Sequence, residues 1–375
     1  MRRPTAGLRS ARCRESVRNG RGSRGSGPAS RRNPRCERPA RARSGACATA
    51  AYSTDWPKRA FELPIPGTRL AELFCRAGVG RLTLVDRDLV EWSNLQRQAL
   101  FTERDAAEAR PKVEAAAAAL SAINSQVTTV PLFAEFDDAF IWASRKWLSE
   151  VDVIVDGVDN FEARFLMNEL SIRDRIPYVY GGAVGMEGCC MPVLGGERPC
   201  LECAMGGAGV PALQATCSLR GVLASTVTQV AALQFAEATK ILIGARDACM
   251  PGMHFFNAWD NLHLQISVAR RSSCSVCGER RFPHLEGKRR TGSRTLCGRT
   301  AIQLHRREVN DAFIDEQAAR AGGQIRRRSP AHLEVAYTVD ARDFVLTFFR
   351  DGRVVVDGTS DEREAKRILA EVVGY

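Results

Sequence analysis

The sequence predicts an α/β protein: a Rossmann-like, doubly wound and mostly parallel sheet, followed by a small α+β module. Two observations support this fold class. Short apolar runs alternate with segments of helical periodicity from about residue 67 to residue 243. The two clearest runs, RLTLVD at 81–86 and VDVIVDG at 151–157, are apolar without alternation. Such runs are typical of strands that are buried on both faces of a parallel sheet.

The other elements of the predicted domain at 61–285 follow the same order. The first helix is indicated by Leu70, Leu73 and Phe74, which share one helical face. Pro111 disturbs the early part of the second helix, and Gly244 ends the last one. The expected strands cover 81–86, 127–133, 151–157 and 176–183, and the expected helices cover 67–78, 105–122, 160–173 and 222–243.

A second predicted domain occupies residues 290–375. It follows the polar linker EGKRRTGSR at 286–294. The dipeptide Asp351-Gly352 stands between FVLTFF and VVV, which predicts a β-hairpin. A final helix is expected from Asp361. These features indicate a small α+β module, and no motif in it identifies a role.

The formal net charge of +11 belongs to the first 60 residues. They hold 15 Arg and one Lys against three acidic side chains, whereas residues 61–375 hold 38 basic and 40 acidic side chains. A nucleic-acid-binding domain carries its excess positive charge on the fold. The nearly neutral body therefore argues against a nucleic-acid partner.

The head at 1–60 contains almost no aliphatic residues, so we predict that it is disordered. As a functional segment it would be an RNA-binding arm, an organelle transit peptide or a tail for an acidic partner. The alternative is that it is not the native N-terminus, because the start or the reading frame was wrongly assigned.

The sequence contains no segment of roughly 18 uncharged apolar residues, the length that a membrane helix needs. The head also lacks the apolar core of a secretory signal. The 13 cysteines are therefore interpreted as reduced thiols and metal ligands rather than as a disulfide framework. The predicted location is the cytoplasm, with no membrane partner.

Two Cys-x-x-Cys pairs predict a structural zinc site. They are Cys200 with Cys203, and Cys274 with Cys277. Each pair can place two thiolates on one tetrahedral Zn²⁺. The long separation between the pairs means that the metal would join two distant elements. The competing interpretations are free reduced thiols and a redox role.

Five charged residues predict a nucleotide site. Asp86 and Asp88 close a predicted strand, where acids bond ribose hydroxyls in doubly wound folds. Arg97 and Lys112 are cations that suit phosphate, and Asp159 follows another strand end. Two cations and one acid fit a triphosphate with Mg²⁺ better than a dinucleotide. For any one of these residues, a solvated surface charge is the simpler interpretation.

Taken together, four segments resemble the ThiF/MoeB/HesA family of ubiquitin-activating-enzyme-like adenylyltransferases. They are NLQRQALF at 94–101, Pro-Lys at 111–112, INSQV at 123–127 and VDGVDNFEARFLMN at 155–168. The resemblance covers roughly residues 67–285.

This resemblance implies an enzyme that uses ATP and Mg²⁺ to adenylylate the C-terminal glycine of a ubiquitin-like sulfur-carrier protein. The product serves sulfur transfer in cofactor biosynthesis of the thiamine or molybdopterin type. A sulfur donor and a homodimer are the other implied partners. The implied nucleotide ligands are Gly67, Asp86, Asp88, Asn94, Arg97, Gln98 and Lys112, with Asp159 on Mg²⁺ and the four cysteines on Zn²⁺ away from the nucleotide.

Cys217 lies just before the long helix predicted at 222–243. A thiol near a helix N-terminus has a lowered pKa and is a better nucleophile. Some relatives use a cysteine followed by Gly-Val in persulfide or thioester chemistry, and Gly221-Val222 matches that pattern. Cys217 is thus a candidate catalytic residue beside Arg97, Lys112 and Asp159. A buried inert thiol is the equal alternative.

The sequence departs from the family before Gly67. The family has a strand and a Gly-x-Gly-x-x-Gly turn there, whereas this chain has AFELPIP, with Glu62 and Pro64 where glycines are expected. We therefore expect the first strand and most of the phosphate loop to be missing. Two other functions stay open: a zinc-stabilised scaffold that binds a ubiquitin-like partner without catalysis, and an NAD-binding Rossmann enzyme.

Overall fold

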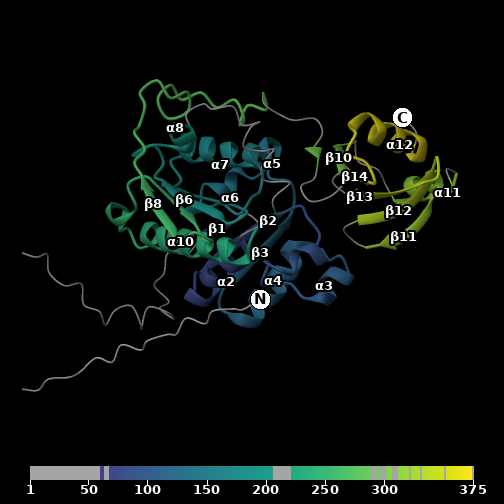
Figure 1. Ribbon diagram of the computed structural model, residues 1–375, viewed down its shortest axis with the longest axis horizontal. Coiled ribbons are helices and arrows are strands. Elements are labelled where there is room, and N and C mark those ends of the chain that lie inside the picture. Colours follow the sequence, from purple (N-terminus) through teal and green to yellow (C-terminus); the bar gives the residue numbers. More distant parts are fainter. Residues whose placement is uncertain are drawn as a thin grey trace, which may run out of the picture. The chain divides into compact units, whose positions relative to one another are not determined.

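Two β-sheets organise the chain in a computed structural model (Figure 1). The structure describes residues 60–62, 67–205, 221–288, 294–295, 301–305, 311–320, 322–329, 332–349 and 352–373. The prediction for Cys217 lies outside these residues, as does the predicted disorder of the head up to residue 59, and Ala60 belongs to a strand.

The first sheet is mixed. Its order is β3 (Thr128–Phe133), β2 (Arg81–Asp86), β1 (Ala60–Glu62), β4 (Val153–Val155), β5 (Tyr178–Val184), β6 (Glu187–Val193), β7 (Met253–Asn257) and β8 (Leu262–Ile266). The strands from β3 to β5 pair in parallel, and β5 to β8 pair antiparallel. The parallel half has the predicted doubly wound order, but the antiparallel extension was not predicted.

The expectation that no strand precedes Gly67 was wrong. Ala60–Glu62 forms β1 in the centre of the sheet, where Phe61 pairs with Thr83 of β2 and Ile154 of β4. A strand of three residues between two buried neighbours is held by backbone hydrogen bonds, so it needs no long apolar run. Glu62 ends this strand. Pro64 lies outside the described residues.

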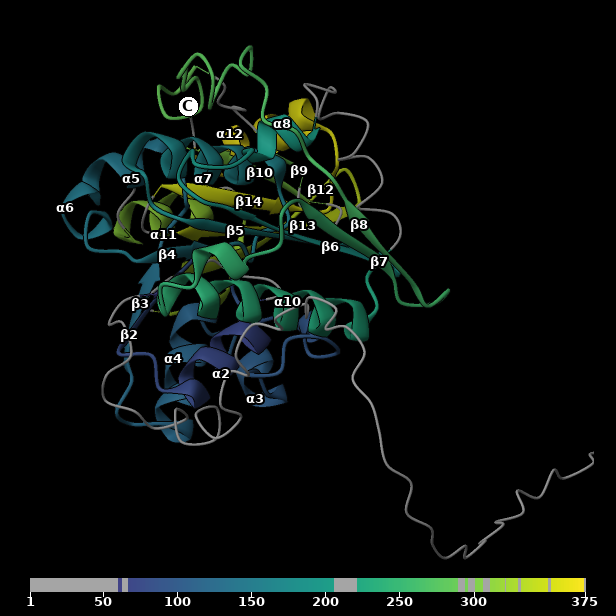
Figure 2. The same cartoon turned by 90° about the vertical axis from the view of Figure 1, so that its left-hand side faces the viewer.

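Helices cover both faces of this sheet, as Figure 2 shows. One face carries α2 (Gly67–Ala77), α4 (Lys112–Ile123) and α10 (Ala224–Leu242), which share a core that includes Phe74, Leu120 and Ile241. The other face carries α7 (Phe161–Asp174), with the short helices α5 (Asp138–Ala143), α6 (Arg145–Leu148) and α8 (Leu201–Met205). Apolar side chains on both sides of a sheet explain why its central strands are apolar without alternation.

The helix predicted at 105–122 is two helices. The first is α3 (Glu103–Ala107), which begins with a capping box between Thr102 and Asp105. Pro111 is the N-cap of α4, so Lys112 is the first helical residue. Proline lacks the backbone donor that a helix interior requires, and it therefore separates the two segments. Two single-turn 3₁₀ helices, η2 (Trp92–Asn94) and η3 (Arg246–Ala248), complete this part.

The second sheet is antiparallel throughout. Its order is β11 (Gln324–Arg328), β12 (His332–Val339), β13 (Arg342–Phe349), β14 (Arg353–Asp357), β10 (Ala301–His305) and β9 (Arg294–Thr295). The helices α11 (Asp311–Arg320) and α12 (Glu362–Val373) share its apolar core. The predicted hairpin joins β13 to β14, and Gly352 there has a φ of 86°, which favours glycine. We call this sheet and its helices the C-terminal module.

Within the described residues, every helix is too short or too polar to cross a lipid bilayer.

Candidate functional site

The predicted nucleotide residues gather at one edge of the first sheet. β2 ends at Asp86 and β4 ends at Val155, and both strands pair in parallel with β1 between them. The carboxyl ends of these strands therefore face the same side, where ligands of doubly wound folds bind.

Asp86, Asp88 and Lys112 form a compact ionic group at this edge. The Lys112 ammonium donates to Asp88 Oδ2 at 2.8 Å and lies 4.0 Å from Asp86 Oδ2. The Asp88 N–H donates to Asp86 Oδ1 at 2.7 Å, which bends the chain just after β2. Asp86 and Lys112 are each only 4% exposed, so these two are largely removed from solvent, whereas Asp88 is partly exposed.

The pKa values of this group follow from burial and from the charges of Lys112 and Arg87 beside the two acids. Burial raises the pKa of Asp86 to about 7, although Lys112 opposes the shift. Burial also disfavours the charged form of Asp88, but Lys112 and Arg87 outweigh it and hold the pKa of Asp88 below its usual range. For Lys112, burial is outweighed by Asp88 and Asp86, which raise its pKa. Lys112 is therefore a permanent cation here.

The segment from Glu91 to Gln98 brings three further predicted residues to the site. Asn94 is buried, and its Oδ1 accepts from the Glu91 N–H at 3.1 Å, which closes the turn of η2. Arg97 donates from Nη1 to the Ser93 carbonyl at 2.8 Å. Burial lowers the pKa of Arg97, while the charges of Asp159 and Glu91 oppose that shift.

Several polar atoms at this edge are buried without a hydrogen-bond partner among the described residues. They are Asp86 Oδ2, Arg97 Nε and both side-chain amide atoms of Gln98. Gln98 is 2% exposed. A buried amide that makes no hydrogen bond costs free energy, on the order of 1–3 kcal/mol. A bound polar molecule with donors and acceptors would satisfy these atoms, and the sugar and phosphates of a nucleotide offer both.

Asp159 lies in the loop that follows β4, and its side chain is exposed. Its charge acts on the pKa values of Arg97, Arg87 and Lys112, so the loop places it beside the same cations. An exposed carboxylate next to a phosphate site suits Mg²⁺, which usually takes one or two carboxylates together with substrate phosphates.

Gly67 starts α2, and the structure connects it to the same segment. Its neighbour Thr68 accepts a hydrogen bond from the Ala99 N–H at 3.0 Å. This contact fixes the N-terminus of α2 against the stretch that carries Arg97 and Gln98. The turn that would precede Gly67 lies outside the described residues.

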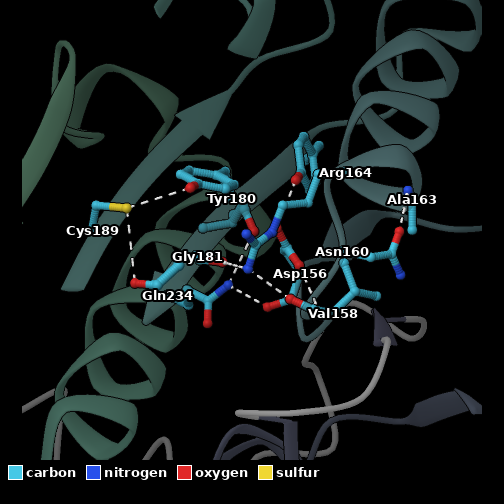
Figure 3. Close-up of polar contacts among 12 residues, drawn as sticks. Asp156, Val158, Asn160, Ala163, Arg164, Tyr180, Gly181, Cys189 and Gln234 are labelled. Carbon is cyan, nitrogen blue, oxygen red and sulfur yellow. Dashed lines mark hydrogen bonds and ion pairs between the residues drawn. The ribbon is translucent and has the colours of Figure 1, made fainter. Parts of the chain in front are cut away.

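A buried network that sequence reasoning missed holds the Asp159 loop (Figure 3). Arg164 of α7 donates to Asp156 Oδ2 at 3.2 Å, to the Val158 carbonyl at 2.6 Å and to the Gly181 carbonyl at 3.2 Å. Asp156 is fully buried and also accepts from the Tyr178 hydroxyl at 2.9 Å. Burial raises the pKa of Asp156, against the pull of the Arg164 charge.

Gln234 of α10 closes this network from the other face of the sheet. Its amide donates to the Asp156 carbonyl at 2.6 Å and to the Val179 carbonyl at 3.2 Å. A Cβ atom on Gly181 would lie only 2.3 Å from the Gln234 amide carbon, so this position requires glycine. In the sequence, Asp156 directly follows the apolar run of β4, and Arg164 lies in the first turns of α7. This spacing was the sequence signal for the ion pair.

The four predicted zinc ligands come together in one buried cluster, which we call the cysteine cluster. The sulfur atoms of Cys200, Cys203, Cys274 and Cys277 all lie within 4.8 Å of one another. The separations are 3.7 Å for Cys200 and Cys274, 3.4 Å for Cys203 and Cys277, and 4.0 Å within the first pair. Zn–S bonds of about 2.3 Å in a tetrahedron give sulfur separations of about 3.8 Å. The cluster therefore fits one tetrahedral metal ion.

Comparison with known proteins identifies the first domain. Residues 66–276 match the model of the ThiF family. The ThiS sulfur-carrier adenylyltransferase of Bacillus subtilis is 36% identical over 315 residues, which cover 82% of this chain and 90% of that protein. An alignment of that length cannot fit within residues 1–285, so it extends into the C-terminal module.

Other similar proteins match a shorter part of the chain. The molybdopterin-synthase adenylyltransferase of Escherichia coli is 35% identical over 215 residues, covering 57% of this chain and 83% of that protein. A crystal structure of Escherichia coli MccB with ATP shares the fold, with a TM-score of 0.51, 23% identity, and coverage of 59% of this chain and 68% of that one.

The names of these relatives confirm the prediction of an adenylyltransferase. The region that matches the family model contains the predicted nucleotide residues and three of the four cysteines of the cluster, and it ends one residue before Cys277. The chain belongs to the ThiF family.

Proposed function

We propose that this chain uses ATP to adenylylate the C-terminal carboxylate of a ubiquitin-like sulfur-carrier protein. One observation supports this most strongly: Asp86, Arg97, Lys112 and Asp159 lie together at one sheet edge, beside the buried amide of Gln98, which makes no hydrogen bond to another described residue. The Bacillus subtilis relative acts on such a carrier, ThiS, and it aligns with most of this chain.

In the proposed reaction, a carboxylate oxygen of the carrier attacks the α-phosphorus of ATP. A P–O bond forms to the carrier, the bond between the α-phosphorus and the bridging oxygen breaks, and pyrophosphate leaves. Asp86 and Asp88 would orient the ribose, and Asn94 and Gln98 would bond the nucleotide. Arg97 and Lys112 would neutralise charge on the phosphates. Because the attacking group is already ionised, the protein positions and neutralises without supplying a base.

Asp159 is the residue that would hold Mg²⁺, since it is a hard oxygen ligand beside the proposed phosphate site. When bound, Mg²⁺ would neutralise negative charge on the triphosphate. The cysteine cluster would hold Zn²⁺ in a closed site with four thiolates and no open position, which is typical of a structural metal.

We propose that sulfur transfer follows the adenylylation step. A donor of sulfide-level sulfur would attack the acyl carbon of the adenylated carrier, so that a C–S bond forms, the C–O bond to AMP breaks and AMP leaves. The carrier would then end in a thiocarboxylate for cofactor biosynthesis, and Cys217 is a candidate participant in this step. We also propose a cytoplasmic location, because reduced cysteines and thiolate metal sites are typical of that compartment, and each of the eight described cysteines lies outside any disulfide. We also propose that the protein forms a homodimer, as the family resemblance implies.

The test is exchange of labelled pyrophosphate into ATP. Exchange should require Mg²⁺ and a carrier that ends in Gly-Gly, and a carrier lacking its last two residues should not support it. The Asp159→Ala variant should lose exchange, whereas Asp247→Ala, an exposed acid on η3, should retain it. Carrier binding without any ATP binding or exchange would instead support the scaffold, and exchange that persists in Asp159→Ala would contradict the magnesium assignment.

A further inference from the structure

The C-terminal module contacts the proposed nucleotide site through one buried arginine. Arg353 is the first residue of β14 and is 2% exposed. Its Nη1 donates to the carbonyl of Arg87 at 3.0 Å, although 266 residues separate the two in the chain. Arg87 stands between Asp86 and Asp88, the two acids that would bind the ribose.

Aromatic rings hold the Arg353 side chain in place. Its guanidinium carbon lies 4.4 Å from the ring centre of Phe349 and 5.4 Å from that of Phe133. Phe133 ends β3, the neighbour of β2, and its ring centre is 6.0 Å from that of Phe349. Leu89, which follows the ribose-binding acids, packs into the same apolar cluster. Arginine between two rings is well oriented, because its planar group stacks on aromatic faces.

The accepting carbonyl belongs to the peptide unit that shapes the loop. A peptide unit is planar, so the Arg87 carbonyl and the Asp88 N–H point in opposite directions from one rigid plane. Arg353 donates to the carbonyl at one end, and the N–H at the other end donates to Asp86 Oδ1 at 2.7 Å. A hydrogen bond that fixes the carbonyl therefore also fixes the N–H that orients the Asp86 carboxylate.

We propose that the C-terminal module is a positioning element of the nucleotide site, in which Arg353 locks the Arg87–Asp88 peptide and so orients Asp86 toward the ribose. The inference rests on the proposed ATP site. Arg353 does not touch the nucleotide in this arrangement. It acts through Asp86, and its loss should weaken ATP binding more than it slows the chemical step.

The experiment compares Arg353→Met, which keeps an apolar chain between the rings, with Arg353→Lys, which keeps a cationic donor. Arg342→Met is the matched control, because Arg342 makes the same kinds of contact inside the module: it donates to the Gly358 carbonyl at 3.0 Å and stacks on Phe344. Loss of a charged hydrogen bond predicts a rise of about tenfold in the KM for ATP in Arg353→Met. The kcat and the KM for the carrier should stay within about twofold, Arg353→Lys should recover part of the loss, and Arg342→Met should match the wild type.

A second readout needs no nucleotide. Hydrogen exchange in the peptides that span residues 82–91 should speed up in Arg353→Met and not in Arg342→Met. A wild-type KM for ATP together with unchanged exchange in that segment would overturn the inference. If the wild-type protein binds no ATP, the proposed function fails, and the hydrogen exchange result alone decides whether Arg353 holds the loop. If Arg353→Met does not fold, Arg353→Lys carries both measurements.

Discussion

Lys112 and Asp88 form an ion pair at 2.8 Å in which the cation is buried and the acid is half-exposed. Asp86 lies behind them, with Oδ2 4.0 Å from the same ammonium. The buried Lys112 ammonium thus lies beside two carboxylates. The Lys112 backbone N–H also donates to the Asp88 carbonyl at 2.9 Å. The pair ties the start of α4 to the loop after β2, so the two elements that would contact ribose and phosphate are positioned together.

The first prediction follows from this pair. Lys112→Met should lower the rate of ATP–pyrophosphate exchange by about 10²–10³-fold, because it removes a preorganised cation from the phosphate site. Lys146→Met, an exposed lysine on α6, should leave the rate unchanged. The rates are compared at saturating ATP and carrier. A Lys112→Met variant with the wild-type rate would exclude this lysine from the reaction.

The second prediction concerns pH. The pKa of Asp86 is raised to about 7, above the usual value that it regains on unfolding, so the folded state binds the Asp86 proton more tightly. This contribution to stability is complete below the pKa of the unfolded state and is lost as the pH rises toward 7. Asp86→Asn removes the contribution. Its free energy of unfolding relative to the wild type should therefore rise between about pH 4 and pH 7, measured by urea denaturation at several pH values. A difference that is constant with pH would contradict the raised pKa.

The third prediction concerns the buried pair of Asp156 and Arg164. Arg164→Met leaves a carboxylate without its cation inside the sheet, which should cost about 3–5 kcal/mol of stability. Adding Asp156→Asn to that variant should restore part of the loss, because the remaining buried group is then neutral. A double-mutant cycle in urea measures this coupling. Two independent losses that simply add would show that the pair does not act as a unit.

The fourth prediction concerns the cysteine cluster. The purified protein should contain one zinc ion per chain, measured by elemental analysis. Cys274→Ser should lose the metal and lower the melting temperature, since three thiolates hold Zn²⁺ less tightly than four. Cys249→Ser provides the control, because Cys249 is also buried and free but lies outside the cluster. A metal-free wild-type protein with an unchanged melting temperature after chelation would contradict the prediction.

The sequence indicated the candidate residues whose positions depend on local structure. Asp86, Lys112 and Asp159 follow strand ends or begin a helix, and apolar runs located those ends. The cysteine pairs were visible because their spacing is itself the signal. Element boundaries were less accurate: Pro111 separates two helices rather than disturbing one.

The remainder depends on contacts between residues distant in the chain. Gln234 and Asp156 are 78 residues apart, and nothing near either one indicates the other. Strand β8 was missed because every one of its residues is exposed, so its apolar pattern does not mark a core. Strand β1 was missed because it has only three residues, which is too short for a recognisable apolar run.

The cysteine cluster also has a thermodynamic consequence. It joins Cys203 to Cys274, and the chain between them includes α10, which supplies Gln234 to the Asp156 network. A metal bound there would act as a reversible cross-link around the helix that supports the Asp159 loop. By mass action, each tenfold rise in free metal above the dissociation constant adds about 1.4 kcal/mol to the free energy of unfolding. The folded fraction of this enzyme would then report the zinc supply of its surroundings.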